Sequence, residues 1–231
     1  MGKNKLKKFA ETFTFDNFIQ PSYDEIKDGY SLKGKWAKEF FKNKNPIILE
    51  LGCGKGEYTV GLAQLHPENN YIGIDIKGSR MWLGCKTSNE KKIKNVAFVR
   101  TKIENIEHFF AKDEISEIWI TFPTPQPKTV TIKKRLTSPQ FLKRYFNIIK
   151  NDAIIHLKTD SRLIFDYTLK VIEKYNHNLI TSTFDLYNSD IKDDVILIRT
   201  YYEKKFLEEN IPINYLKFNI NPETVNKVGI Y

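Results

Sequence analysis

The chain has 231 residues, which is enough to bury one sizeable hydrophobic core but short for two. Its 37 lysine and arginine residues outnumber its 28 aspartate and glutamate residues, so the formal net charge is +9. Proteins this basic commonly bind a polyanion, most often nucleic acid, although a basic surface that serves only solubility is the alternative. The two cysteines exclude a disulfide-dense scaffold and a four-cysteine zinc site.

The sequence also bears on location and metal binding. No apolar run reaches the ~20 residues of a membrane span, and the N-terminal lysines are not followed by the apolar stretch of a signal peptide. Cys53 and Cys85 are expected to be reduced thiols rather than one long-range disulfide, and the four histidines are scattered. We therefore expect a cytoplasmic protein without membrane contacts and without a metal.

Residues 1–28 begin with lysines and continue with aromatic and acidic residues. This composition predicts an N-terminal arm outside the folded domain, either disordered or in contact with RNA. A helix over residues 33–41 is expected to follow it. Residues 29–231 are expected to form a single domain, because no linker and no internal repeat divides them.

From residue 46 onward, apolar segments typical of strands alternate with segments of helical periodicity. Strands are predicted at 46–51, 71–76, 95–100, 115–122 and 153–159. Helices are predicted around 58–65, 79–91, 103–110, 141–149 and 161–175. Five strand–helix units in a row predict an α/β fold, with a parallel sheet covered by helices on both faces. Two more strands, at 179–184 and 195–202, are expected as a hairpin-like antiparallel addition, giving a mostly parallel sheet of seven strands.

The first predicted strand leads into the loop GCGKG at 52–56, and ligands of parallel α/β sheets bind near this loop. The spacing is not the dinucleotide pattern G-x-G-x-x-G, because position 57 is glutamate, and it lacks the G-K-S/T of a phosphate-binding loop. Glu50, at the strand end, suits a cationic amino group, and Asp75, at the end of the second strand, suits ribose hydroxyls. The alternative is a glycine turn beside two exposed carboxylates.

The loop, Glu50 and Asp75 together resemble the S-adenosylmethionine site of class I methyltransferases, which have a Rossmann-like fold. Further motifs are FPTPQPK at 122–128, KKR at 133–135, TD at 159–160 and TYYE at 200–203. In this order they resemble the tRNA (guanine-N7-)-methyltransferases over roughly residues 46–205. The resemblance implies transfer of a methyl group from S-adenosyl-L-methionine to N7 of guanine 46, in the variable loop of tRNA.

The resemblance also assigns roles to particular positions. It places the cofactor at Glu50, Gly52, Gly54, Gly56, Asp75 and Lys102, and the substrate at Lys128, Asp160, Thr200, Tyr201, Tyr202 and Glu203. RNA phosphates are expected at Lys133, Lys134 and Arg135, with a solvated loop as the alternative. Asp160 and Glu203 are expected to accept hydrogen bonds from the Watson–Crick edge of the guanine. Asp160 is also expected to be catalytic, because a carboxylate near the base favours the positive charge that the guanine gains during the transfer. Their ordinary alternatives are a helix N-cap for Asp160 and an exposed strand end for Glu203.

Two positions depart from the pattern of the family. Thr124 stands at the catalytic position where the family has an acidic residue, and Lys102 stands where many members carry a carboxylate near the adenine. Thr124 can donate a hydrogen bond but brings no charge. Two other functions therefore stay open: a methyltransferase acting on another RNA or a small molecule, and a non-catalytic RNA-binding protein of this fold. The oligomeric state is left open between monomer and homodimer.

Overall fold

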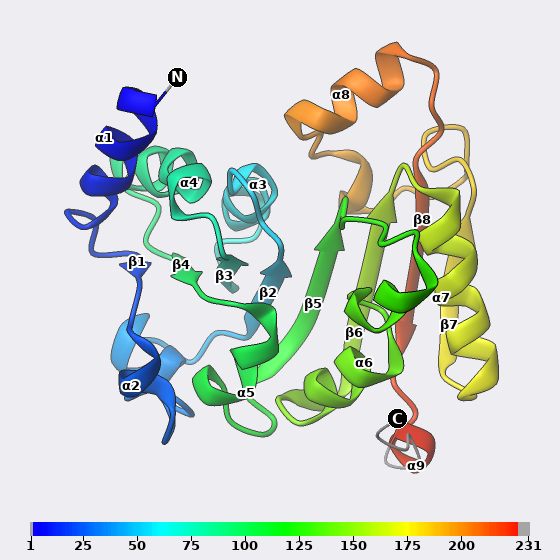
Figure 1. Cartoon of the computed structure of the whole chain (residues 1–231), viewed down its shortest axis with the longest axis horizontal. Helices are drawn as coiled ribbons and strands as arrows, with labels where there is room; N and C mark the ends of the chain where they lie inside the picture. The colour runs from blue at the N-terminus through cyan, green and yellow to red at the C-terminus, as the bar shows by residue number, and fades with distance from the viewer. Residues whose placement is uncertain (1, 226–231) are drawn as a thin grey trace.

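A mostly parallel β-sheet runs through the whole molecule (Figure 1). The computed structural model of the chain describes residues 2–225. Within them the strands are β1 (Phe18–Ile19), β2 (Ile47–Leu51), β3 (Asn70–Asp75), β4 (Val96–Arg100), β5 (Ile115–Thr121), β6 (Ile149–Thr159), β7 (Asn178–Thr183) and β8 (Asn214–Asn219). Their order is β1-β4-β3-β2-β5-β6-β8-β7. Strand β8 runs antiparallel to both of its neighbours, and the other pairs in this sheet are parallel.

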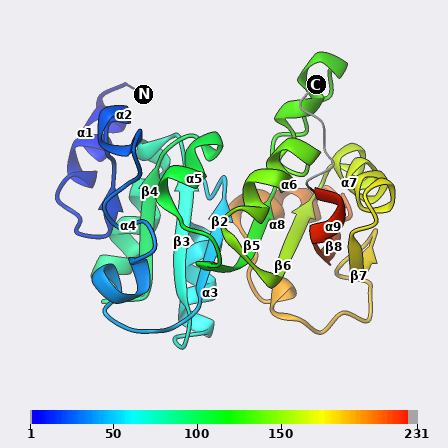
Figure 2. The same ribbon diagram turned by 90° about the horizontal axis from the view of Figure 1, so that it is seen from below.

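Helices cover both faces of this sheet (Figure 2). One face carries α3 (Glu57–Leu65), α4 (Gly78–Glu90) and α8 (Tyr201–Glu208), and the other carries α5 (Ile106–Phe109), α6 (Pro139–Phe146) and α7 (Arg162–Lys174). The remaining helical segments are α1 (Gly2–Thr12), α2 (Tyr23–Ile26), α9 (Pro222–Val225), a π-helix η1 (Trp36–Phe40) and the 3-10 helices η2 (Ile103–Asn105), η3 (Thr129–Lys134) and η4 (Asp194–Ile196). Each face of the sheet has its own hydrophobic core.

The predicted alternation of strands and helices over residues 46–175 is confirmed. Each predicted strand and helix in this stretch has a counterpart, with one difference near residue 147. The segment expected as one helix over 141–149 is divided, because α6 ends at Phe146 and β6 begins at Ile149. The segment expected as a helix over 33–41 contains the π-helix η1.

Residues 2–28 are part of the fold and not an arm beside it. Helix α1 packs on α4, where the indole Nε1 of Trp82 donates to Glu11 Oε2 at 2.8 Å. Strand β1 pairs in parallel with β4 and adds an eighth strand to the sheet. The physical reason lies in the aromatic residues of this stretch, since Phe15 and Phe18 pack against the core beneath α3 and α4.

The second correction concerns the strand expected at 195–202. These residues form η4, a short connection and the first turn of α8, and the antiparallel strand is β8 instead. Hydrogen bonding at residues 200–203 explains the difference. Thr200 is the N-cap of α8 and Glu203 completes a capping box, so this motif starts a helix and does not end a strand.

Two smaller findings concern thiols and membranes. Cys53 and Cys85 are buried free thiols, so the disulfide alternative is not formed. None of the helices within residues 2–225 is both long and apolar enough to cross a bilayer.

Candidate active site

A pocket of about 530 Å³ opens at the carboxyl ends of β2, β3 and β5. From β2 the chain proceeds outward to β3 and β4, and β5 then pairs on the opposite side of β2. Ligands of open α/β sheets bind at such a reversal of strand order. Thr200 and Tyr202, at the start of α8, also line the pocket.

The glycine loop after β2 contributes several lining residues. Gly52, Gly54 and Gly56 have φ angles of 79°, 55° and 72°, a backbone conformation that residues other than glycine rarely adopt. The N–H groups of Gly52 and Cys53 both donate to the carbonyl of Ile74, at 2.8 and 3.0 Å, which ties the loop to β3. Gly52 and Gly54 line the pocket, whereas Gly56 lies behind it as the N-cap of α3.

Glu50 lines the pocket although only 4% of the residue is exposed. Its carboxylate accepts hydrogen bonds from Thr121 Oγ1 at 2.6 Å, from the Thr59 N–H at 2.8 Å and from the Thr59 hydroxyl. Burial raises the pKa of Glu50 to about 7, against the lowering effect of these hydrogen bonds. A cation bound next to this carboxylate would therefore favour its ionised form.

Asp75 is placed at the end of β3 with both oxygens in fixed positions. Oδ2 accepts from the Gly54 N–H at 3.0 Å, and Oδ1 accepts from the Lys77 N–H at 2.8 Å. A carboxylate has about four lone-pair sites, so each oxygen can still accept a hydroxyl. Asp75 lines the pocket next to Gly54, in agreement with a ribose-binding role.

The loop after β5 brings Thr124 to the pocket as an exposed residue. Arg135 holds this loop: its Nε donates to Pro125 O and its Nη2 to Gln126 O, at 3.2 and 3.1 Å. Arg135 is only 6% exposed and its guanidinium lies 4.4 Å from the ring centroid of Tyr167. Arg135 is therefore occupied within the protein and is not free to contact an RNA phosphate.

The start of α8 contributes residues of two kinds. Thr200 and Tyr202 face the pocket, whereas Glu203 is fully buried and pairs with Lys158, Nζ to Oε1, at 2.7 Å. Tyr201 is exposed, and its ring centroid lies 4.0 Å from the Nζ of Lys55.

Asp160 follows β6 outside the pocket wall, where partial burial raises the pKa of its carboxyl. Asp160 is not the helix N-cap that was expected as its alternative role, because Ser161 is the N-cap of α7.

The structure thus divides the predicted site residues into two groups. Those that line the pocket are Glu50, Gly52, Gly54, Asp75, Lys102, Thr124, Lys134, Thr200 and Tyr202. Those that do not are Gly56, Lys128, Lys133, Arg135, Asp160, Tyr201 and Glu203.

Several pocket residues were not predicted from the sequence. Lys55 and Arg80 line the pocket, and Thr121 fixes Glu50 through its hydroxyl. The signal for Lys55 was its place between two loop glycines. Thr121 could have been found as the last residue of the strand next to β2. Arg80 had no signal, because it lies on α4 among residues that read as an ordinary helix.

The pocket wall carries charges of both signs, and its lining includes the carboxylates of Glu57 and Glu104. Glu50 and Asp75 lie at the strand ends, where a cationic and hydroxylated ligand would bind. The cations in the wall are Lys55, Lys77, Arg80, Lys102 and Lys134, and all except Lys55 are largely exposed. The exposed cations of the wall would suit a polyanion.

Comparison with known proteins gives close relatives. A family model described as "Putative methyltransferase" matches residues 44–216. A tRNA (guanine-N(7)-)-methyltransferase of Christiangramia forsetii is 52% identical, over 94% of this chain and 98% of that relative. The same enzyme of Bacteroides thetaiotaomicron is 50% identical, over 97% of this chain and 89% of that relative. The Listeria innocua enzyme is 38% identical, over 83% and 88%.

Solved structures resemble the chain in fold. The 16S rRNA methyltransferase KamB superposes with a TM-score of 0.61 at 13% identity, over 80% of this chain and 92% of that one. A 30S ribosomal A1408 methyltransferase from an uncultured bacterium gives 0.57 at 20% identity, over 78% and 90%. At these identities the likeness concerns the fold alone, and it confirms the predicted class I methyltransferase architecture.

Proposed function

Because the chain belongs to the tRNA (guanine-N(7)-)-methyltransferase family, we propose that it methylates N7 of a guanine in tRNA, guanine 46 of the variable loop. The observation that carries the proposal is one pocket in which Glu50 and Asp75 face residues of the two substrate motifs, Thr124 and Tyr202. A tRNA substrate also accounts for the net charge of +9 and implies work in the cytoplasm.

The residues at the strand ends fit S-adenosyl-L-methionine. Glu50 would accept the ammonium of its amino-acid part, and Asp75 would accept the two ribose hydroxyls. Gly52 and Gly54 leave the loop surface without side chains, so a ligand can approach its backbone. Thr101 and Lys102, after β4, would lie beside the adenine. The cofactor supplies an activated methyl group.

Guanine N7 carries a lone pair and no proton, so no residue has to act as a general base before the transfer. The task of the chain is to align N7 and to exclude water. Thr124 and Thr200 offer hydroxyls to the base, and the ring of Tyr202 offers a surface for stacking. Asp160, at the same edge of the sheet, is the remaining carboxylate proposed for the Watson–Crick edge.

The tRNA backbone would contact the exposed cations beside the mouth. Lys134 is in the pocket wall, and Lys128 and Lys133 are exposed on the same loop. Because the target nucleotide lies within a structured part of the tRNA, it has to be displaced from its stack to reach the pocket.

A methylation assay tests the proposal. Incubation with unmodified tRNA and labelled S-adenosyl-L-methionine should yield 7-methylguanosine as the labelled nucleoside. A tRNA whose variable-loop guanine is replaced by adenine is the matched control and should accept no label. Label in another nucleoside would contradict the proposed substrate position.

The departure at Thr124 favours one second candidate, a non-catalytic RNA-binding protein of this fold. That function predicts binding of both tRNA and cofactor without methyl transfer. Restoration of transfer by Thr124→Asp would then locate the loss at this position.

A further inference from the structure

A buried ion pair lies behind the pocket and takes no part in its wall. Nζ of Lys158, on β6, lies 2.7 Å from Oε1 of Glu203, on the first turn of α8, and both side chains are 0% exposed. Removing two charges from water is costly, so such a pair persists only where its geometry and further hydrogen bonds compensate. These further contacts show what the pair holds in place.

The ammonium of Lys158 is used fully. Besides Glu203 it donates to the carbonyls of Val195 at 2.6 Å and Ile198 at 3.2 Å. These carbonyls belong to η4 and to the connection that leads into α8. One side chain on the central sheet therefore fixes the path of the chain up to the N-cap residue Thr200.

The carboxylate of Glu203 also has several partners inside the protein. Oε1 also accepts from the Tyr187 hydroxyl at 2.6 Å, and Oε2 accepts from the Thr200 N–H at 3.3 Å. In return, Thr200 Oγ1 accepts from the Glu203 N–H at 3.3 Å. Because Glu203 is fully buried and absent from the pocket lining, it presents no oxygen to the pocket.

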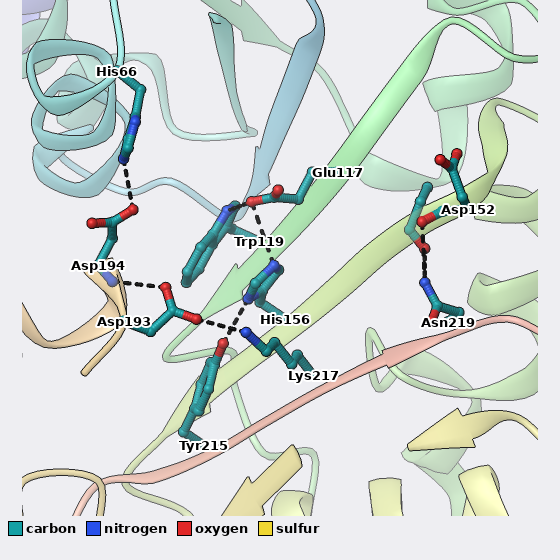
Figure 3. Close-up of polar contacts among 11 residues, drawn as sticks. His66, Glu117, Trp119, Asp152, His156, Asp193, Asp194, Tyr215, Lys217 and Asn219 are labelled. Atoms are coloured by element: carbon teal, nitrogen blue, oxygen red, sulfur yellow. Dashed lines mark hydrogen bonds and ion pairs between the residues drawn. The ribbon is translucent and has the colours of Figure 1, made fainter. Parts of the chain in front are cut away.

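Two further contacts, made by Asp193 and Asp194, hold the same segment (Figure 3). Asp193 pairs with Lys217 on β8, and Asp194 pairs with His66 after α3, both at 2.6 Å. Both contacts are partly exposed, in contrast to the pair of Lys158 and Glu203. The buried pair involves Glu203, which belongs to the capping box of α8 together with Thr200.

We propose that Lys158 and Glu203 are positioning residues: their ion pair sets where Thr200 and Tyr202 stand in the pocket, and Glu203 acts on the guanine only through them. This inference rests on the proposed methyl transfer to tRNA. It differs from a role in which Glu203 itself binds the base, and the two roles predict opposite results when both partners are replaced.

The experiment compares Lys158→Met, Glu203→Gln and the double variant. Each single change leaves a buried charge without its partner, whereas the double variant buries none, and the amide introduced by Glu203→Gln can still bond Tyr187 and the Thr200 N–H. We expect each single variant to raise KM for tRNA and to lower kcat/KM by about 10- to 100-fold, with KM for the cofactor within about twofold of wild type. The double variant should be clearly less impaired than either single variant, because it leaves no charge buried without a partner. It should not return fully to wild type, because the hydrogen bonds of Lys158 to the carbonyls of Val195 and Ile198 are lost.

Asp166→Asn is the matched control, because it removes a carboxylate from an exposed pair with Arg162 on α7, away from the pocket. This variant should leave KM for tRNA and kcat/KM unchanged. A double variant as impaired as Glu203→Gln would overturn the proposal and assign Glu203 to substrate contact. Wild-type kinetics in Lys158→Met would overturn it as well.

Hydrogen exchange keeps the test independent of activity and of failed folding. Amides of residues 195–203 should lose protection in the single variants and regain part of it in the double variant, measured without tRNA. If a single variant does not fold, the double variant is compared with wild type directly, and unprotected amides in a folded double variant would contradict the proposal. If the wild type transfers no methyl group, the proposed function fails while the exchange pattern still decides the role of the pair.

Discussion

The ionisation of Glu50 is linked to what the pocket binds, because its carboxyl is buried and still lines the wall. Burial raises its pKa to about 7, so the folded free protein holds a proton there that an unfolded chain releases above its ordinary value of 4.5. This contribution to stability is complete below pH 4.5 and is lost as the pH rises through 7. A bound ammonium reverses the preference by favouring the carboxylate.

Cofactor affinity should therefore depend on pH. Between pH 6 and pH 7 the ionised fraction of a group with a pKa of about 7 grows roughly fivefold, so Kd for S-adenosyl-L-methionine should fall about fivefold. The cofactor's own amino group stays protonated in this range, with a pKa near ~7.8. Titration calorimetry at both pH values measures the change, and proton release on binding should accompany it.

Glu50→Gln is the control for this dependence. The variant should bind S-adenosyl-L-methionine more weakly than wild type at pH 7. Its own Kd should be the same at pH 6 as at pH 7. A wild-type Kd that does not change between the two values would mean that Glu50 does not contact the cofactor's ammonium.

At the residue scale, local motifs predicted the cofactor end of the site better than the substrate end. Glu50 and Asp75 could be placed because each ends a strand and parallel strands end at one edge of a sheet. The positions of Glu203 and Arg135 could not be predicted, because the groups that bind their side chains come from other segments of the chain. Lys158 on β6 pairs with Glu203, and Arg135 turns back onto the carbonyls of Pro125 and Gln126.

Elements follow the same rule. The strands and helices from β2 to α7 were predictable because each carries its own apolar periodicity. The segment 195–202 is rich in β-branched and aromatic residues, which favour strands, yet its capping box starts a helix. Strand β1 is two residues long, too short to show any period, and only its pairing with β4 reveals it.

The junction of α3, α4 and β4 depends on small residues. Gly56 is the N-cap of α3, and a Cβ on it would come within 2.5 Å of the Phe98 ring on β4 and 3.2 Å of Gly84 on α4. Gly52 has a similar positive φ but open space around it. A substitution at Gly52 therefore measures the cost of the backbone conformation alone, whereas a substitution at Gly56 adds the cost of packing.

Gly52→Ala should lower the free energy of unfolding by about 1 kcal/mol, the cost of a left-handed conformation. Gly56→Ala should lower it by about 2–4 kcal/mol, because the clash with Phe98 is added. Urea denaturation of the two variants measures the difference. Equal losses would show that α3 and β4 separate freely enough to admit a methyl group.

At the scale of the whole molecule, the excess of 37 cations over 28 carboxylates provides a field that attracts tRNA. The cations that would contact phosphates directly are those exposed near the mouth, among them Lys133 and Lys134. Lys150, at the opposite end of β6, and Lys170, on α7, are equally exposed but lie away from the pocket wall.

The salt dependence of tRNA affinity should separate these two sets. Replacing Lys133 and Lys134 by glutamine should reduce the slope of log K against log salt by about 1.5, since each phosphate contact contributes roughly 0.7–0.9. The same change at Lys150 and Lys170 lowers the net charge equally and should leave the slope within about 0.3 of wild type. Filter binding over a salt series measures both. An equal effect of both pairs would mean that tRNA senses only the total charge.

The strand order β6-β8-β7 has a consequence for the order in which a ribosome delivers the chain. Strand β7 leaves the ribosome before β8, yet it pairs with β8 and not with β6, so it has to wait for residues 214–219. The segment that carries Thr200, Tyr202 and Glu203 lies between these two strands. During synthesis the half of the sheet from β2 to β6 can therefore assemble early. The part of the pocket that would face the guanine can fold only after the last strand has been synthesised. A nascent chain can therefore form the cofactor-binding part of the pocket well before the substrate-binding part.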